Sequence, residues 1–295
     1  MENVFLNNLT SFSLGTICTL SLISAYNNLM TKKLNNNNNN TVESNSPSSS
    51  SSSPESNKSN NINIRIPQHL AIIMDGNRRY GREKYGNTIQ GHRSGGETLI
   101  NFIKWCKEEN IEMLTVFAFS SENWNRDTYE INAMMKLFLE YTERLKKEVI
   151  EQNIRVKVLS THFDKLPENI KISINELEEL SKSNSGFQLN VCLSYGSRAE
   201  ITAAARHLAR DAVNGNIEPS SINEDIFSSY LSTAGLPEPD ALIRTSGEYR
   251  LSNFLLWQLA YTEMFFVDKF WPALEKSDFH QILREYGDRQ RRYGS

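Results

Sequence analysis

The chain has 295 residues, of which 39% are hydrophobic and 23% charged, and its formal net charge is −3 at pH 7. A mildly acidic chain is a poor candidate for nucleic-acid binding, because the phosphate backbone selects clustered positive charge. The three cysteines, Cys18, Cys106 and Cys192, are scattered through apolar contexts. We therefore expect reduced thiols and neither a disulfide framework nor a zinc site.

The first 65 residues differ in composition from the rest of the chain. They contain a run of asparagines at 35–40 and a run of serines at 48–53. Such a polar stretch buries too little apolar surface to offset the entropy cost of ordering. Residues 35–65 are therefore predicted to be a disordered linker. The remaining residues, 66–295, are long enough for one domain with a sizeable core.

The start of the chain leaves two alternatives open. Residues 12–26 mix apolar with small polar side chains, and Lys32-Lys33 follow them. This stretch is shorter than the roughly 20 residues that span a bilayer. Residues 1–34 are therefore predicted to be either a weak membrane anchor or a disordered tail.

The first strong element is the apolar run Leu70–Met74, which is typical of a buried strand. Polarity then changes abruptly at Asp75–Arg79. Asp offers oxygen ligands to Mg²⁺, Gly lets backbone N–H groups approach an oxyanion, and Arg matches phosphate oxygens. The sequence thus predicts a Mg²⁺–diphosphate site, the alternative being an Asp-Gly turn with solvated arginines.

A second strand is predicted at Met113–Phe119, and it too ends in a polar cluster, Ser120–Arg126. Between the two strands, the Gly-rich segment Gly91–Gly96 is expected to be a loop that offers free N–H groups at the start of a helix. Because ligands bind beyond the carboxyl ends of parallel strands, both polar clusters are expected to share one site.

A long helix is predicted at 129–152, with a stripe of Met, Phe and other apolar residues at helical spacing. The stripe indicates core, or alternatively the lining of a cavity for a long apolar ligand. Further along the chain, the periodicity predicts strands at 156–159, 187–194 and 241–243 and helices at 166–180, 200–213 and 222–231.

The strand at 241–243 leads into a third polar segment, Arg244–Asn253, which reads as a second anion cradle. Further on, Glu263 is a lone acid among aromatic residues, which requires a metal-bound group or a buried base as its partner. Strands and helices alternate throughout. The fold class is therefore α/β, a mostly parallel sheet of about six strands with helices on both faces.

The polar segments closely resemble the motifs of one family. They read MDGNRR at 74–79, GH at 91–92, FSSENWNR at 119–126, IRTSGEYRLSNFLLWQ at 243–258, and RYG at 292–294. Their sequence and order are similar to those of cis-prenyltransferases, which include undecaprenyl and dehydrodolichyl diphosphate synthases. The resemblance covers residues 66–295, which it implies are the catalytic domain.

The resemblance implies a Mg²⁺-dependent, head-to-tail condensation of isopentenyl diphosphate onto an allylic diphosphate, which we expect to be farnesyl diphosphate. The product would be a polyprenyl diphosphate of the dolichol or undecaprenol type, held in a hydrophobic product tunnel. The apolar stripe of the long helix would line that tunnel. The length of the product is not fixed by the sequence.

The resemblance also assigns roles by motif. Asp75 would hold Mg²⁺ on a diphosphate, Glu263 would be a second metal contact, and Asn123 would help to direct proton loss. The residues implied to bind the allylic diphosphate are Gly76, Asn77, Arg78 and Arg79. Those implied to line the substrates are Tyr80, His92, Ser120, Ser121, Glu122, Trp124 and Arg126. Those implied to bind isopentenyl diphosphate are Arg244, Arg250, Leu251 and Ser252, with Arg292 and Gly294 reaching across a dimer.

Some positions depart from the bacterial pattern. Thr88 and Tyr249 stand where bacterial members carry an arginine and a metal-contacting histidine, which leaves these two contacts in doubt. Arg78 and Tyr80 are similar to eukaryotic dolichol-type enzymes. From this resemblance we expect the protein at the cytosolic face of the endoplasmic reticulum, with peripheral membrane contact, or in the cytoplasm.

The presence of Asp75 and of the 292–294 tail in one chain favours a self-sufficient homodimer. The rival hypothesis is a non-catalytic, isoprenoid-binding partner subunit of a two-component synthase. Such partners generally lack the loop that carries Asp75 and Arg79.

Overall fold

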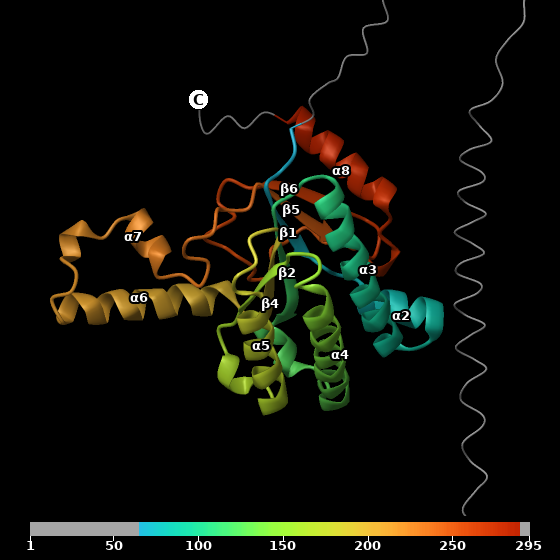
Figure 1. The fold of residues 1–295 in the computed structure, drawn as a ribbon, viewed down its shortest axis with the longest axis horizontal. Coiled ribbons are helices and arrows are strands. Elements are labelled where there is room, and N and C mark those ends of the chain that lie inside the picture. Colours follow the sequence, from blue (N-terminus) through green and yellow to red (C-terminus); the bar gives the residue numbers. More distant parts are fainter. Residues whose placement is uncertain (1–64, 290–295) are drawn as a thin grey trace, which may run out of the picture. The chain divides into compact units, whose positions relative to one another are not determined.

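The computed structural model describes residues 65–289, and its centre is one parallel sheet (Figure 1). The sheet has six strands in the order β3-β4-β2-β1-β5-β6, and every neighbouring pair is parallel. The strands are β1 His69–Ile73, β2 Met113–Ser120, β3 Arg155–Leu159, β4 Gln188–Tyr195, β5 Ala241–Thr245 and β6 Glu263–Val267. The predicted α/β fold with a sheet of six strands is confirmed.

Seven α-helices lie within the described residues. They are α2 Asn77–Tyr85, α3 Thr88–Glu108, α4 Thr128–Glu148, α5 Glu168–Ser181, α6 Ser197–Val213, α7 Glu224–Ser229 and α8 Lys276–Asp288. Apolar side chains of α3, α5 and α8 pack in one large core with the strands, and α4 joins it through partly buried residues. On the opposite face, residues between 251 and 259 pack over the sheet. Helices α6 and α7 extend away from the sheet at the left of Figure 1.

The segment predicted as a Gly-rich loop is helical, which corrects that prediction. Gly91–Gly96 lies inside α3, which begins at Thr88 after Asn87 caps it by accepting a bond from the Ile89 N–H at 2.8 Å. The glycines are there because of close packing: a Cβ on Gly91 would overlap the backbone of α2. Glycine lowers helix propensity, so this tertiary requirement was hidden from a local reading.

Three further boundaries differ. The polar cluster after β1 is a loop only as far as Gly76, since α2 begins at Asn77. Helix α4 ends at Glu148 rather than near 152, and the predicted helix at 222–231 is only the short α7. Arg78 and Arg79 are therefore fixed on the first turn of a helix.

The register of the sheet brings the polar segments together. Ile73 of β1 lies beside Phe117 of β2 on one side and beside Arg244 of β5 on the other. All these strands point the same way, so the residues that follow them emerge at one edge. That carboxyl edge is where the three polar segments of the sequence converge.

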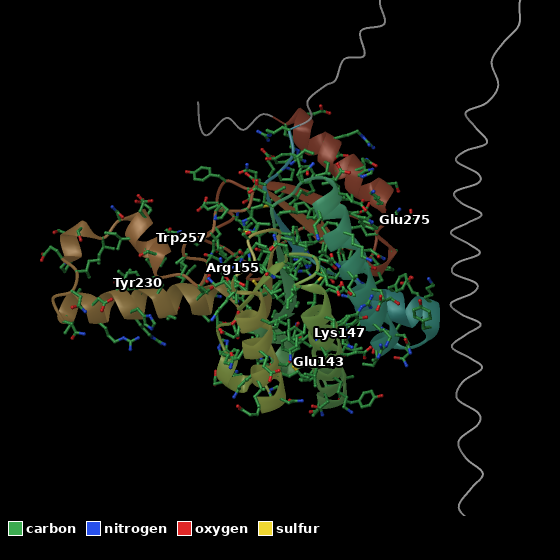
Figure 2. All side chains as sticks on the ribbon, viewed as in Figure 1. Glu143, Lys147, Arg155, Tyr230, Trp257 and Glu275 are labelled. Atoms are coloured by element: carbon green, nitrogen blue, oxygen red, sulfur yellow. The ribbon has the colours of Figure 1, made fainter. Side chains whose placement is uncertain are left out.

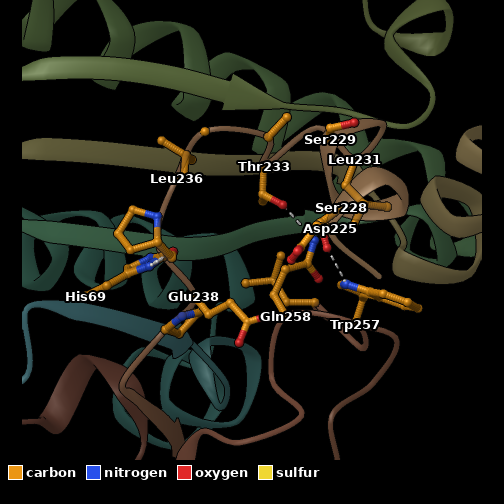
Figure 3. A pocket seen from close by; sticks show the side chains of 15 residues that line it. His69, Asp225, Ser228, Ser229, Leu231, Thr233, Leu236, Glu238, Trp257 and Gln258 are labelled. Carbon is orange, nitrogen blue, oxygen red and sulfur yellow. Dashed lines mark hydrogen bonds between the residues drawn. The ribbon is translucent and has the colours of Figure 1, made fainter. Parts of the chain in front are cut away.

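The amino edge of the sheet holds a separate cavity of about 200 Å³, between β1, α7 and the chain before β5 (Figure 3). His69 lies in its wall and is 2% exposed. Its Nδ1 lies 2.8 Å from the Pro237 carbonyl and its Nε2 lies 2.7 Å from the Thr115 hydroxyl. A carbonyl only accepts, so Nδ1 carries the proton and Thr115 donates to Nε2.

Burial of that neutral ring lowers the pKa of His69 from 6.5 to about 4. The two described cysteines, Cys106 and Cys192, are free and buried, and burial raises the pKa of both thiols. Cys18 lies outside the described residues. Within residues 65–289, no helix combines the length and hydropathy of a membrane span.

We expect His69 to make the fold sensitive to acid. Below pH about 6.5 the unfolded chain binds a proton at His69, whereas the folded chain does so only near pH 4. The free energy of unfolding should therefore fall with pH through that window, by up to about 3 kcal/mol from this residue. Guanidinium chloride unfolding at several pH values measures this. The free energy of unfolding of His69→Gln should fall less between pH 6.5 and pH 4 than that of the wild type.

An equal fall in the free energy of unfolding of wild type and His69→Gln over this pH range would contradict the prediction.

Candidate active site

An ion pair between Asp75 and Arg244 forms the centre of the carboxyl edge. Arg244 Nη2 donates to Asp75 Oδ2 at 2.8 Å, and the arginine side chain is 2% exposed while the aspartate is 30% exposed. Arg244 Nη1 also donates to the Ser252 hydroxyl at 2.8 Å and to the Arg250 carbonyl. A buried guanidinium with several acceptors holds its orientation, so one Asp75 oxygen edge stays fixed and open to solvent.

The backbone around this pair is tightly packed. Gly76 has φ +94°, and a Cβ there would lie 2.7 Å from Phe270 Cδ1 and 2.8 Å from Ser246 Oγ. The Gly76 N–H donates to Asp75 Oδ1 at 2.6 Å, and Asp75 N–H donates to the Thr245 hydroxyl at 3.0 Å. Only glycine fits this turn, which aims the Asp75 carboxylate away from the sheet.

A cavity of about 590 Å³ opens beside the ion pair and gathers ten of the predicted site residues. These ten are Asp75, Asn77, His92, Ser120, Glu122, Asn123, Arg126, Arg244, Arg250 and Ser252. They come from α2, α3, β2, β5 and the segments that follow β1, β2 and β5. Three arginines face a cavity with two carboxylates, so the arrangement suits an anionic ligand.

Glu130 organises one wall of this cavity and was missed by the sequence analysis. It lies in the first turn of α4, is 6% exposed, and contacts Arg126 at 3.1 Å and Arg78 at 3.2 Å. His92 Nε2 lies 3.4 Å from the same carboxylate. The only local signal was the i, i+4 spacing of Arg126 and Glu130, which is common on ordinary helix surfaces.

Burial sets the charges of this wall. It lowers the pKa of His92, and the neighbouring Arg126 lowers it further, so the ring is neutral at pH 7. Burial also lowers the pKa of Arg126. Burial acts to raise the pKa of Glu122, but hydrogen bonds led by one from Asn253 outweigh it and lower the pKa.

Asn123 is held in place by the turn after β2. Its Oδ1 accepts the Ser120 N–H at 3.1 Å, and the Ser120 side chain in turn accepts the Asn123 backbone N–H. The two bonds form a capping box at the start of the 3₁₀ turn Ser121–Asn125. The amide oxygen is thereby occupied, which leaves the amide N–H groups to serve the cavity.

Several predicted site residues do not line the cavity. The indole of Trp124 donates to the Ser194 hydroxyl at 2.8 Å, and the Tyr80 hydroxyl accepts from Lys84 at 2.6 Å. Ser121 packs against Gly196. Leu251 packs in the hydrophobic cluster on the face of the sheet that is covered by residues between 251 and 259. Gly76, Arg78 and Arg79 lie directly behind the lining residues, Arg79 at 3.6 Å from Asp75 Oδ1 and 3.3 Å from Glu248.

Glu263 is the clearest difference from expectation. It is the first residue of β6 and lies beside Ala241, whereas Arg244 lies three residues further along β5. Its carboxylate pairs with Arg289 at 3.1 Å. Within one chain Glu263 therefore faces the other end of the strands and is not placed to share a metal ion with Asp75. The predicted contacts Arg292 and Gly294 lie outside the described residues.

A divalent cation at this site would need ligands besides the protein side chains. Within residues 65–289, no group of three or more His, Cys, Asp or Glu side chains could hold a metal ion alone. Mg²⁺ is commonly bound by one or two carboxylates, with substrate phosphates and water completing the shell. The partly exposed Asp75 beside an anion-binding cavity fits that pattern.

An apolar cavity of about 150 Å³ adjoins the polar one, and both share Met74, Asn77, His92, Ala118 and Met134 in their walls. It runs between α3, α4, α5 and the sheet. The sequence left two alternatives for the apolar stripe on α4, core packing and cavity lining, and the structure shows both. Met134, Phe138 and Leu145 face the cavity, while Met135 is in the core.

Several known proteins are similar to this chain. Residues 73–294 match the family model described as "Putative undecaprenyl diphosphate synthase". The chain is 46% identical to tritrans,polycis-undecaprenyl-diphosphate synthase (geranylgeranyl-diphosphate specific) of Thermococcus kodakarensis, over 78% of this chain and 87% of that protein. It is 41% identical to ditrans,polycis-undecaprenyl-diphosphate synthase ((2E,6E)-farnesyl-diphosphate specific) of Micrococcus luteus, over 80% of this chain and 95% of that protein.

A solved structure agrees with these relatives. Lavandulyl diphosphate synthase from Lavandula x intermedia, in complex with dimethylallyl diphosphate, is similar with a TM-score of 0.75 and 33% identity. The match covers 78% of this chain and 99% of that one.

We expect Arg244→Met to weaken the binding of inorganic pyrophosphate by about ten- to a hundredfold, because a charged hydrogen bond contributes about 1.5–3 kcal/mol. Isothermal titration calorimetry of wild type and variant measures the change. Arg155, labelled in Figure 2, is exposed at the start of β3, so Arg155→Met is the matched control. Equal affinities in wild type and Arg244→Met would show that the cavity is not the anion site.

Proposed function

The chain belongs to the cis-prenyltransferase family and is a prenyl-transferring enzyme of the polyprenyl diphosphate synthase type, and from this premise we propose its substrates and site chemistry. It condenses isopentenyl diphosphate onto an allylic diphosphate and builds a polyprenyl diphosphate with Mg²⁺ as cofactor. The observation that carries the proposal is the Asp75–Arg244 pair in an arginine-lined cavity that continues into an apolar one.

The two parts of that space match the two parts of an allylic substrate. The arginine-lined part suits a diphosphate, and the apolar part between α3 and α4 suits an isoprenoid tail. Asn77, Arg78 and Arg79, at the start of α2, surround Asp75 and would hold the allylic diphosphate at a helix N-terminus. Arg244, Arg250 and Ser252 would hold the second diphosphate.

Mg²⁺ held by Asp75 would neutralise the charge that develops on the leaving diphosphate. The arginines around the cavity stabilise the same charge with fixed donors, and burial of Arg244 strengthens its interaction. The closed apolar wall excludes water from the carbocation-like centre. The terminal alkene of isopentenyl diphosphate then attacks the allylic carbon, and one proton leaves.

The geometry around Asn123 bears on where that proton goes. Its Oδ1 is occupied by the Ser120 N–H, and an amide is a weak base in any case. We therefore assign Asn123 to orienting a diphosphate through its N–H groups. A diphosphate oxygen then takes the proton.

The allylic partner is proposed to be farnesyl diphosphate. The Micrococcus relative is named as specific for it, and the Thermococcus relative for geranylgeranyl diphosphate. A direct competition of the two substrates ranks them by kcat/KM. We further propose a dolichol-type product and, for residues 1–34, contact with the cytosolic face of the endoplasmic reticulum membrane. Those residues lie outside the described part.

We expect Asp75→Ala to lower turnover by at least about a hundredfold without unfolding the chain, since it removes the carboxylate that we assign to the metal. The assay follows labelled isopentenyl diphosphate into lipid extracts in the presence of farnesyl diphosphate and Mg²⁺. Circular dichroism checks the fold, and chelation with EDTA should abolish the wild-type rate. Near-normal rates for Asp75→Ala would refute the metal role. A wild-type chain that makes no lipid alone would instead indicate a partner subunit.

The 290–295 tail is proposed to complete the site of a second copy, in a homodimer. A chain truncated after Arg289 and the Asp75→Ala chain should each be inactive, the first without the tail and the second without the carboxylate. Mixed after unfolding and refolding together, they should recover roughly a quarter of the wild-type rate, because half of the dimers are mixed and each has one intact site. No recovery on mixing would mean that the tail serves its own chain or no site.

A further inference from the structure

The wall between α3 and α4 is built around one close contact. Gly96 of α3 faces Tyr141 of α4, and a Cβ on Gly96 would overlap the tyrosine ring. Both residues line the apolar cavity, with Leu99 and Leu145 beyond them. The missing side chain of Gly96 therefore lets the Tyr141 ring lie in the wall itself.

Polar bonds fix that ring from outside the cavity. The Tyr141 hydroxyl donates to the Arg93 carbonyl at 2.9 Å and contacts Glu97 at 3.1 Å. Arg93 binds Glu140 with two bonds of 2.6 and 2.9 Å, and Arg144 binds Glu97 at 3.0 and 3.1 Å. We call these five residues the α3–α4 clasp.

The clasp is more than a set of surface charges. Isolated exposed ion pairs contribute little to stability. Here Arg93 pairs with Glu140 through both of its terminal nitrogens, and Arg144 donates from Nη1 to both oxygens of Glu97. The two pairs connect α3 and α4, whose inner sides form a cavity, and the Tyr141 hydroxyl contacts one residue of each pair. All four charged side chains are about half exposed, so solvent or substitution can open them without an unpaired buried charge.

The cavity is small for the proposed product. Its volume is about 150 Å³, whereas pockets for drug-sized ligands hold roughly 300–1,000 Å³. On α4, Tyr141 lies roughly 10 Å below Met134, which borders the polar cavity, and Leu145 roughly 16 Å below it, at 1.5 Å per residue. That depth accepts a short allylic tail. A longer chain requires the wall to move.

We propose that the α3–α4 clasp, with Tyr141 as its central residue, limits product length by holding the two helices together around the growing chain. This inference rests on the proposed function and deepens it. Each added isoprene unit pushes the tail further along α4, past Tyr141. While the clasp is closed, the tyrosine ring and the fixed helix spacing stop that advance. Weakening the clasp lets α3 and α4 separate and admits more units.

The test compares product-length distributions by reverse-phase chromatography at a fixed ratio of isopentenyl to farnesyl diphosphate. Glu140→Gln and Tyr141→Ala should shift the main product to longer chains by at least one isoprene unit. Tyr141→Phe, which keeps the ring but loses the hydroxyl bonds, should shift it less than Tyr141→Ala. The double variant Arg93→Glu with Glu140→Arg should return towards the wild-type length, since it restores the pair in reverse.

A matched control removes an exposed ion pair of α3 that is remote from the cavity. Lys276 pairs with Glu108 at the far end of α3, at 2.5 Å, so Glu108→Gln should leave product length unchanged. Unchanged product length in Glu140→Gln and Tyr141→Ala, or the same shift in Glu108→Gln, would overturn the proposal.

A second measurement does not depend on turnover. Wild type and Tyr141→Ala are titrated with farnesyl thiolodiphosphate, which does not ionise readily, and with longer synthetic polyprenyl thiolodiphosphates. The variant should gain about tenfold in relative affinity for the longer chains. If no chain makes lipid but this ratio shifts, the clasp stands and the proposed reaction fails. An unshifted ratio overturns the clasp whether or not the enzyme is active.

Discussion

The contact between Arg244 and Asp75 is the interaction on which the site depends. The two terminal nitrogens of an almost fully buried guanidinium need hydrogen-bond acceptors inside the protein. Asp75, Ser252 and the Arg250 carbonyl supply them, and they come from segments nearly 170 residues apart in the chain. The parallel register of β1 and β5 makes that meeting obligatory, because it sets Ile73 beside Arg244. The ion pair with Arg244 thus sets the orientation of the site carboxylate.

The same edge contains unusual backbone and unpaired polar atoms. Ser246, Ser252 and Asn253 have φ of 84°, 50° and 64°, a region that costs of order 1–3 kcal/mol for a side-chain-bearing residue. Buried Asn77 Oδ1, Arg244 Nε and Ser246 Oγ have no hydrogen-bond partner among residues 65–289. Such features concentrate where a ligand completes the hydrogen bonding, which agrees with a site for two diphosphates.

Glu130 and the clasp show how helices α3 and α4 serve both halves of the space. In the first turn of α4, Glu130 holds Arg78, His92 and Arg126 around the polar cavity. Closer to the C-terminus of α4, Tyr141 and the neighbouring ion pairs border the apolar cavity. A single pair of helices therefore positions the charged head and bounds the space for the tail. Changes in their spacing would be felt by both.

The sequence by itself determined the sheet, the chain direction of its strands and the polar segments that follow β1, β2 and β5, because alternating apolar runs and their polar ends are local patterns. It also indicated ten residues that the structure brings into one cavity. It misplaced the start of α3, since Gly91 and Gly95 are required by packing against α2 and Asn77, which no local propensity reveals. It gave no sign that the indole of Trp124 donates to Ser194. Only the tertiary structure decided that Glu263 faces the opposite edge from Asp75, that Glu130 joins three cationic or titratable side chains, and that Tyr141 fits against Gly96. These are contacts between elements far apart in the chain, and their residues carry no mark of one another until the fold fixes the distances between them.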